Sequence, residues 1–144
     1  MATMTTKTGV SAAATNATSV PKWQLWTGRV LTAIPVLMMT MSGGMKLSHA
    51  PGFVAMWTEK LGYPEKVLTA VGILELLCVA LYVVPRTAVL GAVLLSAYLG
   101  GAVTSHLRIG DPFFIPIVLG IFVWGGLWLR DERVRALLPI KQQP

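Results

Sequence analysis

The sequence predicts an all-α, polytopic membrane protein: a four-transmembrane-helix bundle with a short interfacial helix in the first outer loop. Two observations carry this prediction. Hydrophobic residues make up 54% of the 144 residues and charged residues only 12%, about half the charged share of a soluble domain. The apolar residues also gather into four segments, each close to the length that crosses a hydrocarbon core of ~30 Å.

A polar tail is expected on each side of the helical domain. Residues 1–22 are rich in Ala, Thr and Ser and show no apolar period, so we interpret them as a disordered N-terminal tail. This tail also lacks the short apolar core of a signal peptide. The transmembrane domain is expected over 23–135 and a C-terminal tail over 136–144.

The four apolar segments define the expected spans. Pro64 and Pro85 bound the second, and only Pro85-Arg86 separates it from the third, which predicts a tight antiparallel hairpin. Trp124 and Trp128 lie one turn apart near the end of the fourth, as interfacial aromatic residues do. The spans are expected at about 26–45, 67–84, 87–105 and 113–129.

The longest connection, 46–66, contains the predicted interfacial helix. In it, an apolar run from Phe53 to Trp57 precedes Thr58-Glu59-Lys60, and Pro51 introduces the run. Such a segment is typical of a short amphipathic helix that lies on a membrane surface.

Basic residues predict the orientation in the membrane. An even number of spans places both termini on one side, which then holds eight Lys and Arg residues against four on the other. We therefore expect cytoplasmic termini in the inner (cytoplasmic) membrane. The eight are Lys7, Lys22, Arg29, Arg86, Arg130, Arg133, Arg135 and Lys141, and the four are Lys46, Lys60, Lys66 and Arg108.

Glu75 is the first candidate for chemistry, because it is the one charge in the second span. A carboxylate at this depth is unfavourable by about 3 kcal/mol unless it is paired or used. It could bind a ligand or carry a proton, or it could lock the bundle through a basic partner. Lys46 is the nearest candidate partner by depth, with Arg29 and His106 as alternatives. Lys46 could also be a simple interfacial anchor.

Small residues recur at every fourth position of the third span. This spacing lets helices approach closely, so we expect the third helix to be the central, crowded one. A second row passes through Gly101, and together the two rows leave room for a homodimer. The positions assigned to helix packing are Ala92, Ser96, Gly100, Gly101 and Thr104.

His106 and Arg108 follow at the outer end of this span, and Asp111-Pro112 opens the next segment. These polar groups could cap the helix ends and form a salt bridge, or they could form an anion or quinone head-group site in which His106 donates to a carbonyl oxygen. Tyr98 is a candidate whose hydroxyl needs a buried partner. We expect mutation of Glu75 to cause a greater loss of function than mutation of His106.

Several functional classes are not indicated. The +6 net charge does not point to nucleic acid, because the basic residues flank apolar segments and form no patch. A single cysteine, Cys78, cannot build a multi-cysteine metal site, and His49 lies in a loop rather than on a helix, so no metal or haem is expected. We find no catalytic constellation and do not expect an autonomous enzyme.

Three motifs together resemble the DoxX-like family of small four-helix bacterial membrane proteins. Gly43-Gly44-Met45-Lys46-Leu47 is similar to the Gly-x-x-Lys-Leu that ends the first helix of that family, and Gly72-Ile73-Leu74-Glu75 to the Gly-x-x-Glu of the second. Tyr98-Leu99-Gly100-Gly101-Ala102 followed by His106-Leu107-Arg108 resembles the third-helix pattern. The resemblance covers about 24–135 and implies a link to quinone-dependent redox systems.

Three functions remain open from the sequence. The first is a non-catalytic membrane subunit that binds quinone beside a redox-enzyme partner, with Glu75, Lys46 and His106 lining one cavity. The second is an assembly or chaperone-like membrane protein in which the same charges lock the bundle. The third is a small transporter. Four spans without an internal repeat make this function less favoured.

Overall fold

The computed structural model describes residues 21–137, and within them the chain is helical without any β-strand. Four long helices dominate: α1 (Lys22–Leu47), α3 (Leu68–Val83), α4 (Ala88–Arg108) and α5 (Phe114–Arg130). Shorter elements are α2 (Pro51–Ala55), the π-helix η1 (Met56–Lys60), the 3₁₀-helix η2 (Glu65–Val67) and α6 (Glu132–Leu137). The predicted tails fall almost wholly outside the described residues, but Lys22 already belongs to α1 and 136–137 belong to α6.

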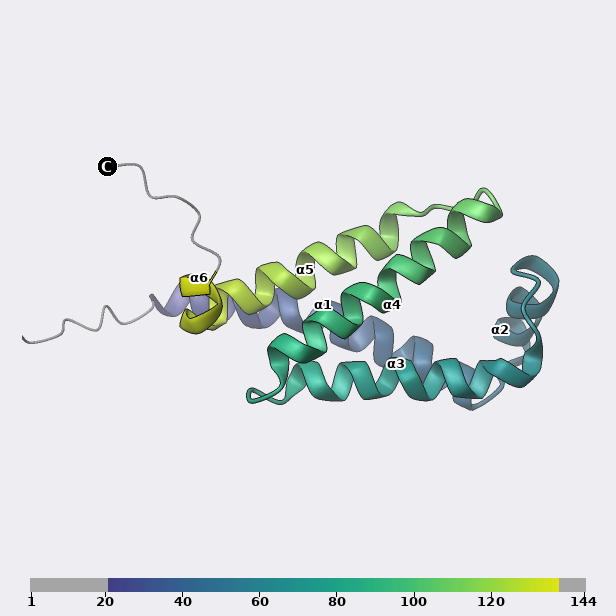
Figure 1. Cartoon of the computed structure of the whole chain (residues 1–144), viewed down its shortest axis with the longest axis horizontal. Helices are drawn as coiled ribbons and strands as arrows, with labels where there is room; N and C mark the ends of the chain where they lie inside the picture. The colour runs from purple at the N-terminus through teal and green to yellow at the C-terminus, as the bar shows by residue number, and fades with distance from the viewer. Residues whose placement is uncertain (1–20, 138–144) are drawn as a thin grey trace, which may run out of the picture.

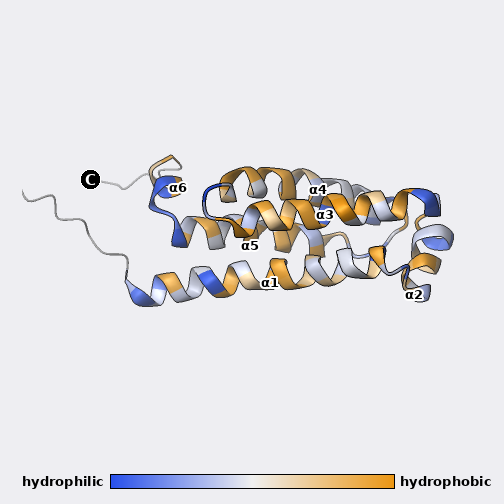
Figure 2. Ribbon diagram, turned by 90° about the horizontal axis from the view of Figure 1, so that it is seen from below, coloured by the Kyte–Doolittle hydropathy of each residue, from blue (hydrophilic) through white to orange (hydrophobic). Residues whose placement is uncertain are grey.

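The long helices coincide with the four apolar segments of the sequence. Three stretches are long and apolar enough to cross a membrane: Lys22–Leu47, Glu65–Val83 and Ala88–Arg108. Phe114–Arg130 is apolar as well but shorter. Hydrophobic residues cover most of these helices and hydrophilic ones gather towards the two ends of the bundle (Figure 2). This distribution is that of a membrane protein.

The four helices pack as a ring in which α1 and α4 each contact both α3 and α5. Figure 1 shows α3 and α4 side by side at their short connection and diverging towards the end where α2 lies. We call that end, which also holds the 109–113 loop, the α2 end, and the opposite end, with Lys22 and Arg130, the terminal end. The bundle is therefore closed at one end and splayed at the other.

Glycines explain the tight closure of the α3–α4 hairpin. A Cβ on Gly91 would lie 2.3 Å from the backbone nitrogen of Tyr82, so only glycine lets the two helices approach this closely. The Tyr82 side chain is fully buried, and its hydroxyl donates to the Val123 carbonyl at 2.7 Å. These contacts join α3, α4 and α5 near the terminal end.

Within residues 21–137, the small residues of the third span pack against a neighbouring helix along only part of its length. Ala92 is fully buried, and Ser96 accepts a hydrogen bond from Trp124 at 2.8 Å. At Gly100 and Gly101, however, no atom of the described residues lies within 4 Å of an added Cβ, and Thr104 is exposed. An α-helix turns about 100° per residue, so a row of every fourth residue moves around the helix and leaves its neighbour after a few steps. The helix is accordingly one member of the ring and not its centre.

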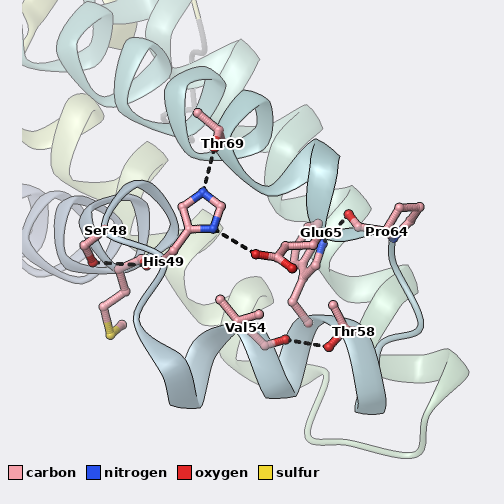
Figure 3. A network of polar contacts seen from close by, with 9 residues as sticks. Ser48, His49, Val54, Thr58, Pro64, Glu65 and Thr69 are labelled. Carbon is pink, nitrogen blue, oxygen red and sulfur yellow. Dashed lines mark hydrogen bonds and ion pairs between the residues drawn. The ribbon is translucent and has the colours of Figure 1, made fainter.

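The α2 and η1 segment covers the splayed α2 end. Trp57, Leu61 and Leu68 form a small buried cluster beneath it, separate from the main core of the bundle. Figure 3 shows its polar attachments: His49 lies 2.9 Å from the Thr69 hydroxyl and 3.3 Å from the Glu65 carboxylate. The predicted short helix thus exists, introduced by Pro51, and continues as a π-helical turn.

Candidate functional site

A pocket of about 630 Å³ opens at the α2 end of the bundle. Residues of all four long helices and of the α2–η1 segment line it, and apolar side chains make up most of its wall. Leu74 on α3 and Ala97 and Gly101 on α4 line it and are also exposed, so the pocket reaches the side of the bundle between these helices. A mostly apolar pocket with a few converging polar groups is the usual form of a small-molecule site.

The deepest polar feature of the pocket is a buried ion pair. Lys46 Nζ lies 2.7 Å from Glu75 Oε2, and the two side chains are only 5% and 2% exposed. Lys46 also donates to the Ser42 hydroxyl at 2.6 Å, and its ammonium stands 4.8 Å from the centre of the Phe53 ring. The partner of Glu75 in the structure is therefore Lys46, the candidate that the sequence placed at the nearest depth, and not Arg29 or His106.

Two glycines make room for this pair between α1 and α3. A Cβ on Gly72 would lie 2.9 Å from Lys46 Cβ, and one on Gly43 would lie 2.7 Å from Leu76. The close approach brings Lys46 within reach of the carboxylate one turn further along α3. The Lys46 side chain, which like other helical side chains leans towards the N-terminal end of its helix, extends back into the bundle.

The polar residues of α4 divide between the pocket and its rim. Tyr98 lines the pocket together with Glu75. Ser105 and His106 line it two turns nearer the α2 end, where the hydroxyls of Ser105 and Tyr63 lie 2.9 Å apart. Glu75, Lys46, Tyr98 and His106 thus share one pocket, as the first functional hypothesis requires.

Arg108 does not line the pocket but attaches its cover. Its guanidinium donates to the Leu61 carbonyl and stands 4.9 Å from the centre of the Tyr63 ring. Lys60, at the end of η1, pairs with Asp111 at 2.8 Å. Asp111 Oδ2 lies 3.9 Å from His106 Nδ1, which is buried and has no hydrogen-bond partner among residues 21–137. The charges predicted as an outer rim therefore connect α4 and its following loop to the η1 segment.

Sequence reasoning missed the contribution of the first loop to the pocket. Phe53 and Trp57 lie one turn apart and face inwards, a spacing that could have indicated a wall of the site. Ser42 lies one turn before Lys46 and could have been identified as its partner in the same way. Within residues 21–137, no three His, Cys, Asp or Glu side chains gather closely enough to hold a metal ion.

The helices and the pocket define a small all-helical membrane protein with a buried ion pair beside an apolar cavity. A family model described as the DoxX-like family matches residues 30–126, about two thirds of the chain. The chain belongs to this family, and the matched range contains both partners of the ion pair and all of the pocket lining. Searches of curated proteins and of solved structures gave no match.

Proposed function

We propose that this DoxX-like protein is a non-catalytic membrane subunit that holds quinone for a partner redox enzyme. The pocket is the observation that carries the proposal. Its wall is apolar enough for a ring and a hydrocarbon tail, and its few polar groups could orient a head group. In this arrangement α1, α3, α4 and α5 all span the inner membrane, α2 lies at its surface, and the termini are cytoplasmic.

The side opening supports a lipid-soluble ligand. Leu74, Ala97 and Gly101 lie where α3 and α4 face the hydrocarbon in the proposed topology. A quinone dissolved in the bilayer could then enter between the two helices without passing through water, while the α2–η1 segment closes the pocket on the aqueous side. Nucleic acid has no part in this account.

Native mass spectrometry of the full chain, purified in mild detergent, tests the proposal. We expect a bound quinone released by activation, and a redox-enzyme chain that co-purifies after gentle extraction. Leu74→Trp, which would fill the side opening, should lower quinone occupancy severalfold, whereas Leu77→Trp, on the same exposed face of α3 but outside the pocket, should not. Purified protein with neither quinone nor redox partner would contradict the proposal.

The buried ion pair favours a second candidate, an assembly or chaperone-like protein. Lys46 and Glu75 satisfy each other at the tight α1–α3 approach, as a structural lock would. In that case Glu75→Gln should lower stability and the yield of a partner protein, with no quinone in the wild-type pocket. Quinone in the wild-type protein would decide against this candidate.

A further inference from the structure

The further inference concerns His106 and rests on the proposed quinone site. Most polar groups of the pocket already have partners: Lys46 bonds Glu75 and Ser42, and the hydroxyls of Tyr63 and Ser105 lie 2.9 Å apart. The His106 side chain, in contrast, forms no hydrogen bond within the part of the chain that the structure describes, and its Nδ1 is buried. The imidazole is therefore free to form a hydrogen bond with a polar ligand in the pocket.

The surroundings of His106 decide which hydrogen bond it can make. Nδ1 faces Asp111 Oδ2 at 3.9 Å, too far for a hydrogen bond but close enough for the carboxylate charge to favour a proton on Nδ1. Lys60 Nζ lies 2.8 Å from the same carboxylate oxygen. A neutral imidazole with its proton on Nδ1 has a free lone pair on Nε2, which can only accept.

We propose that His106 Nε2 accepts a hydrogen bond from a hydroxyl of a bound quinol, so that the pocket prefers the reduced form to the quinone. A quinol hydroxyl can donate to this lone pair, whereas a quinone carbonyl is itself an acceptor and would face it unfavourably. Asp111 is the positioning residue, because it fixes the tautomer without touching the ligand. For ligand binding, we therefore expect mutation of His106 to have a larger effect than mutation of Glu75, which reverses the order expected from the sequence.

Isothermal titration calorimetry tests the assignment on the full detergent-solubilised chain, at pH 8 and without oxygen, with ubiquinone-1 and its quinol as probes. We expect the wild-type protein to bind the quinol about tenfold more tightly, the effect of about one hydrogen bond. His106→Leu should make the two affinities similar, because it weakens the binding of the quinol. His106→Gln, whose amide can donate or accept, should bind both forms and show little preference.

Two further variants separate positioning from support of the fold. Asp111→Asn should lose the preference for the quinol, because it removes the negative charge that favours the proton on Nδ1. Lys60→Gln breaks the same surface pair but keeps the carboxylate, so it should retain the preference. Similar melting temperatures for the two variants are expected, since exposed pairs contribute little to stability.

The outcomes distinguish this inference from the proposed function. Equal wild-type affinity for the two forms, or a preference that survives His106→Leu, would overturn the role of His106 while leaving the quinone site in place. No binding of either form to the wild-type protein would overturn the proposed function and this inference with it.

Discussion

The Lys46–Glu75 pair shows at the scale of single residues why a charge can be stable inside an apolar bundle. Each side chain is almost fully buried, so either one alone would be an uncompensated charge. The Lys46 ammonium is stabilised further by its hydrogen bond to Ser42 and its cation–π contact with the Phe53 ring. The sequence indicated Glu75 by its isolation and Lys46 by its depth. It did not indicate Phe53, because the path of the first loop over the pocket depends on contacts distant in the chain.

Removing one charge of this pair should destabilise the protein more than removing both charges. We expect Glu75→Gln to lower the free energy of unfolding by about 3 kcal/mol, because it leaves the Lys46 ammonium buried without a counter-charge. The double variant Lys46→Met/Glu75→Met, which removes both charges, should recover most of this loss. Thermal unfolding in detergent measures both. A double variant less stable than Glu75→Gln would show that the charges themselves, rather than their balance, hold the bundle together.

At the scale of elements, two glycines of α4 illustrate how far a sequence pattern predicts packing. Gly91 and Gly100 both lie in a helix rich in small residues, but within the described part of the chain only Gly91 contacts another helix. The sequence predicted the helix and the hairpin correctly, since Pro85-Arg86 leaves no other connection. Which small residues face a neighbour depends on the angle at which α3 and α4 diverge, and no local pattern encodes that angle.

Alanine substitutions at these two glycines should therefore behave differently. Gly91→Ala should lower the free energy of unfolding by about 2 kcal/mol or more, because the new Cβ meets the backbone of Tyr82. Gly100→Ala is the matched control in open space and should cause no loss, since alanine favours a helix. Thermal melts of the two variants provide the comparison. A loss at Gly100 as large as that at Gly91 would indicate a contact outside the single chain, such as a homodimer.

The attachment of η1 to α4 gives a second prediction at this scale. Arg108→Gln removes a guanidinium that bonds the Leu61 carbonyl and stacks on Tyr63, so the α2–η1 segment should open more often. We expect faster hydrogen exchange of the amides from Met56 to Tyr63. Arg133→Gln, at the terminal end, is the control. Unchanged exchange in Arg108→Gln would mean that the apolar cluster around Trp57 holds the segment without help.

At the scale of the whole molecule, composition and apolar segments were sufficient to predict an all-helical membrane protein, and three short motifs indicated its family. The helix bounds follow from proline positions and from where charges begin, for example Arg108 and Arg130 at the last residues of α4 and α5. The pocket could be foreseen only in part. Its depth results from the splay of α3 and α4, which is a property of the packed bundle rather than of any one segment.

The proposed orientation leads to a prediction for the whole molecule. In a Cys78→Ala background, a membrane-impermeant maleimide added to intact spheroplasts should label Gly52→Cys, which is exposed on α2, and not Arg86→Cys, which is exposed at the other end. Permeabilised cells should label both positions. Labelling of Arg86→Cys alone in intact cells would reverse the proposed topology.

Photo-crosslinking with an azido-ubiquinone tests the central claim, the quinone pocket at the α2 end, most directly. The full chain in membranes would be irradiated with the probe, digested and mapped by mass spectrometry, with and without excess ubiquinone-1. We predict crosslinks on pocket-lining stretches such as Met56–Trp57 and Ala97–His106, and their loss when the competitor is present. Labelling spread over the outer helix surfaces, or unaffected by the competitor, would contradict the claim.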